Sequence, residues 1–280
     1  MLLISIMFMM AWQVSASELY PAIMSYQADR TALNRKYNNF LSNEYFERIG
    51  RLYLDWLKAL ENMPYDSYSA DGKLDYQIFK NYLEKESYFH SAAFEEFKAV
   101  KNVVDFAEPL EKFYQARRMA IKPNAQELAA TFTQVEMAMK TKWEQSRKSK
   151  PYDSWQKAEL ASQVVEAMRK STEEAYKFYF DYDPEFTWWM KEPMASMDKS
   201  LKAYGEFLKN HFENTVVKDD GSGIIGKVVG KTAIEKELAY NMIPYTAEEL
   251  LAEGEKQYAW CEREMLKASQ ELGFGNDWKA

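Results

Sequence analysis

The chain has 280 residues, of which 47% are hydrophobic and 28% charged, and it carries a formal net charge of −7. This composition is typical of a globular protein, with enough residues for one large domain or two smaller ones. Lysine and arginine are outnumbered by aspartate and glutamate. The sequence therefore lacks the basic surplus that a nucleic-acid-binding protein needs to neutralise phosphates, and we expect no nucleic-acid partner.

The first 16 residues carry no charged side chain and end in Val14-Ser15-Ala16, which resembles the small-residue site that signal peptidase cuts. The apolar run is shorter than the roughly 20 residues that span a bilayer. We expect an export signal over residues 1–16, a periplasmic or extracellular mature chain over 17–280, and no membrane contact after cleavage. A buried N-terminal helix is the alternative, because the basic residues that usually open a signal are missing.

Helical periodicity dominates the first half of the mature chain. It predicts one helix over 20–39 and another over 42–62 that begins at the capping residue Ser42. A loop rich in proline and turn residues over 63–72 precedes a long helix over 73–100. The predicted buried face of the second helix consists of Phe46, Ile49, Tyr53, Trp56 and Leu60.

Prolines divide the next part of the chain into four or five further helices. Each proline is expected near a helix start, where its missing N–H group costs little. The five are Pro109, Pro123, Pro151, Pro184 and Pro193. Asn124 with Glu127 also resembles a helix-capping pair.

The strongest local signal lies near the C-terminal end of the sequence. Thr246 and Glu249 have the spacing of a capping box, and Gly273 is placed to end the helix that follows. Between them, apolar and small residues recur at spacings of three and four, which predicts an apolar stripe from Leu250 to Leu272.

A glycine-rich stretch precedes this helix. Gly221 to Gly226 matches the dinucleotide pattern G-x-G-x-x-G, but a helical and polar segment precedes it where a buried strand is required. Residues 226–232 imitate a phosphate-binding loop with one residue too few between the glycines. We therefore expect no bound cofactor and a short β-hairpin or extended loop near 224–229. The fold class is mainly all-α, an elongated array of helices with this one extended patch.

Candidate catalytic chemistry is sparse, because the chain has 2 histidines and 1 cysteine. His90 follows Glu86 by one helical turn, and we expect a solvated i,i+4 pair rather than a fragment of a metal site. His211 is expected at a helix end, where the helix dipole favours it. The spacing H-E-x-x-H is absent, so no catalytic and no metal-binding residue is predicted.

Three stretches carry a resemblance to a known family. They are residues 69–76, 182–189, and 225–230 together with 237–250. In this order they resemble the N-terminal half of the bacterial domain of unknown function family 885, whose members are exported, helical and similar to zinc metallopeptidases. The metal-binding signatures of that family belong to its second half, and none of them occurs in this sequence.

The resemblance implies that this chain is the helical N-terminal portion of an exported zinc-dependent peptidase-like hydrolase. It would form one wall of a substrate cleft, lack the metal site, and have the C-terminal half and a peptide substrate as partners. Zinc is implied for the full-length protein only. Ile224, Ile225, Gly226 and Gly230 are predicted to hold an extended substrate by main-chain pairing, because glycines permit close backbone approach.

A second hypothesis belongs to a different class of function. The chain would then be a self-sufficient periplasmic helical binding or interaction protein. Its aromatic residues, 15% of the chain, would supply a peptide- or glycan-binding surface, with Trp188 and Trp189 as candidates.

Overall fold

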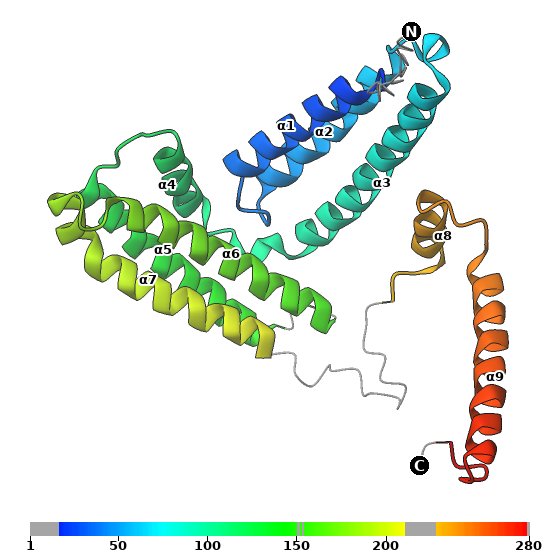
Figure 1. The fold of residues 1–280 in the computed structure, drawn as a ribbon. Coiled ribbons are helices and arrows are strands. Elements are labelled where there is room, and N and C mark those ends of the chain that lie inside the picture. Colours follow the sequence, from blue (N-terminus) through cyan, green and yellow to red (C-terminus); the bar gives the residue numbers. More distant parts are fainter. Residues whose placement is uncertain (1–16, 150–151, 153, 211–227, 279–280) are drawn as a thin grey trace, which may run out of the picture. The chain divides into compact units, whose positions relative to one another are not determined.

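A computed structural model describes residues 17–149, 152, 154–210 and 228–278. Over these residues the chain forms helices and no strand, which confirms the all-α class (Figure 1). The expected extended patch falls largely outside the described residues, and Val228 and Val229 form no strand. The helices are α1 (Tyr20–Lys36), α2 (Asn43–Glu61), η1 (Tyr65–Ser67), α3 (Ala70–Val100), η2 (Lys101–Val104), α4 (Glu108–Arg118), α5 (Ala125–Lys148), α6 (Trp155–Tyr179), α7 (Pro184–Asn210), α8 (Lys231–Tyr240) and α9 (Ala247–Glu271).

The chain divides into two compact units, residues 1–223 and residues 224–280. The first contains α1 to α7 and the second contains α8 and α9. The division falls within the glycine-rich stretch, after Gly223. Among the described residues, no helix is long and apolar enough to cross a membrane.

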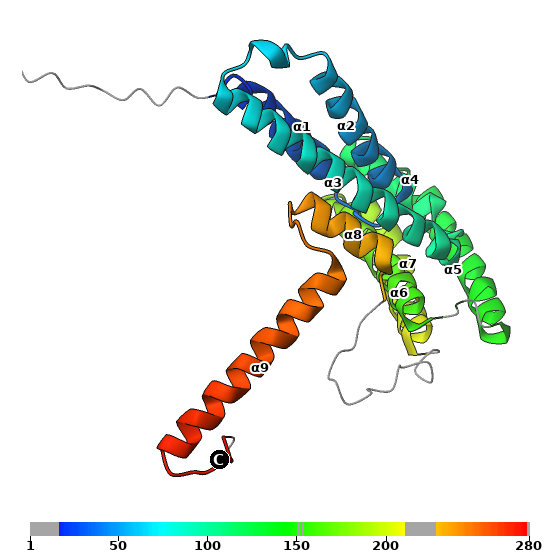
Figure 2. The same ribbon diagram turned by 90° about the vertical axis from the view of Figure 1, so that its right-hand side faces the viewer.

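The first three helices of the first unit pack side by side around one core (Figures 1 and 2). Ser42 caps α2 as predicted, because its hydroxyl accepts a hydrogen bond from the Tyr45 N–H. Of the predicted buried face of α2, only Trp56 is half-buried rather than buried. The buried members of this core are Leu19, Tyr26, Ile49, Leu52, Tyr53, Leu60, Phe79 and Leu83.

A partly buried polar cluster joins these three helices. Arg30 of α1 donates to Glu86 of α3 at 2.9 Å and also to the hydroxyls of Tyr26 and Tyr82. The Tyr53 hydroxyl of α2 donates to the same Glu86 carboxylate at 3.2 Å. Burial raises the pKa of Tyr53, so that its hydroxyl stays protonated and able to donate.

The second core of the first unit is built by α4 to α7, and α3 runs into it. The C-terminal end of α3 contributes Phe97 and Val100 to this core, while its first half belongs to the other core. Phe46 of α2 stacks on Phe94 of α3, with ring centroids 5.0 Å apart and an interplanar angle of 8°. This continuous helix and the aromatic stack connect the two bundles.

Helix α3 begins three residues earlier than predicted. Its first turn, Ala70–Gly72, lies inside the segment predicted as loop. Ser69 caps it by accepting from the Gly72 N–H, and the Glu18 carboxylate accepts hydrogen bonds from both the Ser69 N–H and its hydroxyl. The long-range contact with Glu18 could not be read from the loop composition.

Pro193 lies in the interior of α7, so its predicted place near a helix start is wrong. Proline removes one helix hydrogen bond and costs about 3 kcal/mol in a helix interior. The neighbours Met190, Met194 and Met197 are all buried in the core. Burial of such side chains stabilises by roughly 1.5–3 kcal/mol each, which is enough to keep the helix continuous through the proline.

In the second unit, the local signals at both ends of α9 are confirmed. Thr246 accepts from the Glu249 N–H, and the Glu249 carboxylate accepts from the Thr246 N–H, which completes the capping box. Gly273 has φ of +85° and the Phe274 N–H bonds back to the Ser269 carbonyl. This is a Schellman motif, and it requires the left-handed backbone that glycine adopts most easily.

Candidate functional site

Two hollows lie beside each other in the first unit, where the α1–α2 turn meets α4 and α6. They share Asn39, Tyr114 and Ser171 as lining residues. We call the hollow of about 580 Å³ over α6 the polar hollow, and the hollow of about 660 Å³ toward α1, α2 and α4 the basic hollow. Both volumes are in the range that small ligands occupy in proteins.

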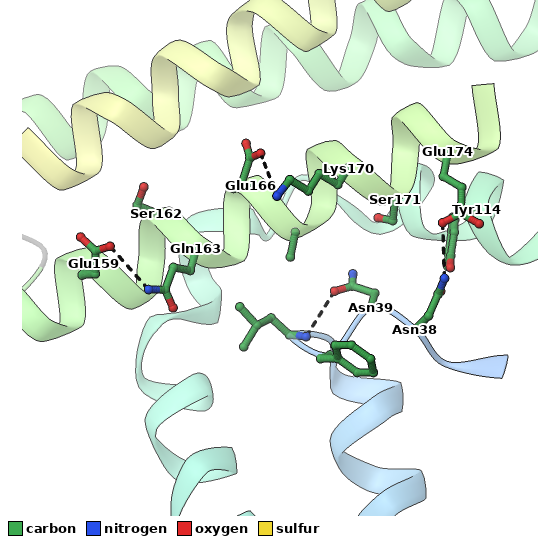
Figure 3. Close-up of a pocket in the computed structure, with 13 residues that line it drawn as sticks. Asn38, Asn39, Tyr114, Glu159, Ser162, Gln163, Glu166, Lys170, Ser171 and Glu174 are labelled. Carbon is green, nitrogen blue, oxygen red and sulfur yellow. Dashed lines mark hydrogen bonds and ion pairs between the residues drawn. The ribbon is translucent and has the colours of Figure 1, made fainter. Parts of the chain in front are cut away.

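The polar hollow is lined by side chains that largely satisfy one another (Figure 3). The Glu166 carboxylate pairs with Lys170 at 3.6 Å, and Glu159 accepts from Gln163 at 3.5 Å. Glu174 accepts a hydrogen bond from the Asn38 amide at 3.3 Å. Among the described residues Glu174 forms no ion pair, so this carboxylate can still receive a cationic or N–H-bearing group.

The basic hollow collects cations from three helices. Arg35 and Lys36 come from the last turn of α1, Arg48 from α2, and Arg118 from the last turn of α4. Basic residues are favoured at helix C-termini by the helix dipole, which explains why α1 and α4 end in them. The fold then brings these two helix ends and Arg48 to the same hollow.

None of these four cations forms an ion pair with a carboxylate within the described parts of the chain. The Arg48 guanidinium lies over the ring of Tyr37, and that of Arg118 over Tyr114, each 5.8 Å from the ring centroid. The buried Arg118 Nε has no hydrogen-bond acceptor. Tyrosine faces therefore support the two guanidinium groups and leave donors available.

Two carboxylates also line the basic hollow, and each is constrained. Glu44 accepts a hydrogen bond from the Gln115 amide at 2.7 Å. Burial, with Glu108 and Glu44 nearby, raises the pKa of the Glu111 carboxyl. The lining thus holds two carboxylates against four cations.

The substrate-binding residues predicted from the sequence are only partly described. Ile224, Ile225 and Gly226 lie outside the described residues. Gly230 is exposed, has φ of +86° and stands at the N-cap of α8. It belongs to the second unit, whereas both hollows belong to the first, so the predicted substrate-pairing role of this segment stays a prediction.

The expected solvated pair between His90 and Glu86 is wrong. Glu86 instead pairs across helices with Arg30, and the His90 Nε2 lies 2.8 Å from the Phe46 carbonyl oxygen. Both side chains are half-buried, because packing of α2 and α1 against α3 covers this face. His211 lies outside the described residues.

The described residues were compared with the ligand groups that a metal site requires. In the part of the chain that the structure describes, no group of three or more His, Cys, Asp or Glu side chains is arranged to hold a metal ion. Cys261, on α9, is exposed. A hydrolytic zinc site takes three protein ligands, so the described residues do not fit one.

Trp188 and Trp189 differ in their surroundings. Trp188 is 74% exposed, whereas Trp189 packs against the core of α4 to α7. Their rings meet edge to face with centroids 4.7 Å apart. Tyr182, in the turn before α7, is exposed as well. Of the two tryptophans, only Trp188 is exposed, so they do not form a paired platform at the surface.

The basic hollow was not predicted from the sequence. Arg35-Lys36 and Arg117-Arg118 are visible as doublets near predicted helix ends, but the dipole alone accounts for such residues. Only the structure shows that Arg35, Lys36 and Arg118 line one hollow together with Arg48.

Comparisons with known proteins found no matching family model, no similar curated protein and no similar solved structure. The resemblance to the domain of unknown function family 885 therefore stays a prediction from the residues quoted for it.

Proposed function

We propose that this chain is the helical N-terminal portion of an exported zinc-dependent peptidase-like hydrolase. In this proposal it forms one wall of the substrate cleft and binds peptide along the two adjoining hollows. The observation that supports it best is the groove itself, in which Asn39, Tyr114 and Ser171 connect a cationic hollow with one that holds the carboxylate of Glu174. A peptide carries amide, anionic and cationic groups in series, and such a lining complements them.

The described residues take no chemical step in this proposal. They do not fit a zinc site, and the Nε2 of His90 is already in contact with the Phe46 carbonyl. By the resemblance, zinc would supply an activated water molecule in the second half of the protein. The contribution of this chain is to bind and orient the peptide.

Peptide binding at the groove can be tested by filling it. Ser171 lines both hollows and its hydroxyl donates only to the Met168 carbonyl of its own helix, so Ser171→Trp places a large ring in the groove. We expect the wild-type chain to bind a fluorescent hexapeptide with a lysine at one end and an aspartate at the other. Ser171→Trp should weaken this binding at least tenfold in fluorescence anisotropy.

The matched control is Ser91→Trp. Ser91 lies on α3, is exposed, and likewise donates to a carbonyl of its own helix, that of Ser87. It lines neither hollow. No binding of this peptide or of a scrambled library by the wild type, or equal losses in the two variants, would contradict the proposed groove.

The second candidate function is a self-sufficient helical binding protein that uses an aromatic surface. The exposed side chains of Phe178, Tyr182 and Trp188 favour it. The apolar side chains of α9 favour the first candidate, because Leu251, Tyr258 and Leu272 are exposed and call for a partner surface. Light scattering and binding of a dye specific for apolar surface separate the two. A monomeric, dye-silent chain with one sharp melt would favour the second.

A further inference from the structure

The basic hollow has an excess of positive charge that the rest of the molecule does not share. Its lining has four cations and two carboxylates, whereas the whole chain has 36 Lys and Arg against 43 Asp and Glu. Elsewhere in the first unit, lysines and arginines commonly pair with carboxylates, as Arg169 does with Glu166 and Asp198. A local cationic concentration of this kind in an acidic protein attracts anions.

The arginines of the hollow suit a small carboxylate, whose two oxygens lie in one plane. Arg48 and Arg118 each have a guanidinium group over a tyrosine ring. This contact limits the motion of the guanidinium group, which can bind both oxygens of a carboxylate at once. Arg118 also donates to the Tyr114 hydroxyl at 3.4 Å, which fixes its position beside the residue shared by both hollows. Arg35 and Lys36, on exposed positions of α1, add charge at the rim.

The two glutamates of the lining offset only part of the charge of its four cations. Glu44 is engaged by Gln115, and neither Glu44 nor Glu111 forms an ion pair with a hollow cation. The hollow also has a limited size, about 660 Å³, in a chain whose 43 Asp and Glu outnumber its 36 Lys and Arg. A compact anionic group therefore fits better than a polyanion that would run along the surface.

We propose that the basic hollow is a subsite for a carboxylate of the bound peptide, with Arg48 and Arg118 as its two principal donors. This inference rests on the proposed function, since it names the substrate feature that the groove selects. The carboxylate comes either from the peptide C-terminus or from an acidic side chain near it. The remainder of the peptide then passes Tyr114 and Asn39 toward the polar hollow.

The experiment compares three fluorescent hexapeptides of otherwise equal sequence: one with an aspartate and a free C-terminus, one with the aspartate and an amidated C-terminus, and one neutral and amidated. Each is titrated by anisotropy into the wild type, Arg48→Gln, Arg118→Gln and Arg51→Gln. Arg51 is the matched control, because it lies on α2 one turn from Arg48, is exposed, and does not line the hollow.

We expect the carboxylate-bearing peptides to bind at least tenfold more tightly than the neutral one. Arg48→Gln and Arg118→Gln should each remove most of this preference and Arg51→Gln should leave it. The difference between the free and the amidated peptide tells which carboxylate is bound. Peptide binding without a carboxylate preference, or an equal effect of Arg51→Gln, would overturn the subsite while leaving the peptide-binding function intact.

A separate measurement covers the case in which no peptide binds and the proposed function fails. Glutarate is then added in a thermal-shift series with the same four proteins at constant ionic strength. A rise in melting temperature in the wild type and in Arg51→Gln, but not in Arg48→Gln or Arg118→Gln, would support the carboxylate subsite by itself. No rise in any of them would overturn it. Circular dichroism shows whether each variant keeps the helical fold.

Discussion

Helices α7 and α9 are similar in length, with 27 and 25 residues, and both carry an apolar stripe. The two helices differ in how many of their residues are buried. The residues of α7 buried in the core of the first unit are Phe186, Met190, Met194, Met197, Leu201, Tyr204, Gly205 and Leu208. In α9 only Ser269 is buried, although a capping box bounds the helix at one end and a Schellman motif at the other. Capping is a property of the chain within a few residues, whereas burial requires a second surface, so the two are independent.

The largest expected effect is the difference in stability lost when a leucine is truncated in α7 and in α9. Leu201 of α7 is 0% exposed and Leu251 of α9 is 66% exposed. Leu201→Ala leaves a cavity in a packed core and should lower the free energy of unfolding by about 2–5 kcal/mol. Leu251→Ala, at an exposed position, should change it by less than about 0.5 kcal/mol.

Urea unfolding followed by circular dichroism at 222 nm measures both variants. An equal loss of stability in the two would mean that α9 packs in solution as closely as α7. The comparison of the two helices would then no longer hold, and the apolar stripe of α9 would have found its partner surface within the chain.

The next largest effect concerns the stability that an interhelical ion pair contributes in the first unit and in the second. Glu86 receives hydrogen bonds from Arg30 and Tyr53, which come from two other helices, and both members of the ion pair are about 30% exposed. Glu86→Gln should destabilise by roughly 1–2 kcal/mol, because partly buried donors then lose a charged acceptor. Glu248→Gln breaks the exposed pair with Lys231 and should leave the stability almost unchanged.

Urea unfolding in low and high salt tests this pair of variants. The loss in Glu86→Gln should persist at high salt, since partly buried pairs are screened less than exposed ones. A Glu86→Gln protein as stable as the wild type would show that the polar cluster of α1, α2 and α3 contributes specificity without stability.

Much of the fold could be predicted from local sequence, and the reasons are physical. Ser42 and the Thr246–Glu249 box act within one helical turn, so their spacing is enough to place two helix starts. The start of α3 was missed because Ser69 is held by Glu18, a residue 51 positions away. Pro193 was misplaced because burial of its neighbours outweighs the local cost of proline.

The candidate site was harder to predict than the fold. Arg48 and Arg118 are 70 positions apart, and nothing in the sequence around either residue indicates that they line one hollow. The glycine-rich stretch was predicted to bind substrate instead, because glycine patterns are conspicuous in an otherwise helical chain. Convergence of side chains from α1, α2 and α4 depends on packing, which periodicity does not encode.

A smaller effect is expected at the residues that follow helix ends in the left-handed backbone conformation. Ala120 follows α4 with φ of +58° and completes the same hydrogen-bond pattern that Gly273 makes after α9. A Cβ atom in this conformation costs about 1–2 kcal/mol, partly offset by the greater freedom of glycine in the unfolded chain. Ala120→Gly should therefore stabilise the first unit by up to about 1 kcal/mol in urea unfolding.

The reverse change belongs to the second unit. Gly273→Ala should speed hydrogen exchange of the last amides of α9 and leave the urea midpoint of the first unit unchanged, because fraying at one helix end opens little else. A lower stability of Ala120→Gly would show that the turn after α4 is not strained by its alanine.

The smallest expected effect is present at neutral pH and is lost in acid. Asp183 caps α7, accepting from the N–H groups of Glu185 and Phe186, and its hydrogen bond with Lys122 and those backbone donors hold the pKa of its carboxyl below the ordinary value. A carboxyl with a depressed folded-state pKa stabilises the fold above its unfolded pKa, about 4, and loses that contribution as the pH falls through the folded value. Asp183→Asn keeps a capping side chain but removes this titration.

The measurement is the difference in melting temperature between the wild type and Asp183→Asn at pH 7 and at pH 2.5. The wild type should melt higher at pH 7, and the gap should be smaller at pH 2.5, because protonation of Asp183 as the pH falls towards its folded-state pKa removes the stabilising charge. Other carboxyls titrate in both proteins and cancel in the difference. A gap that stays constant between the two pH values would mean that the charge of Asp183 does not stabilise α7, and that its cap acts through hydrogen bonding alone.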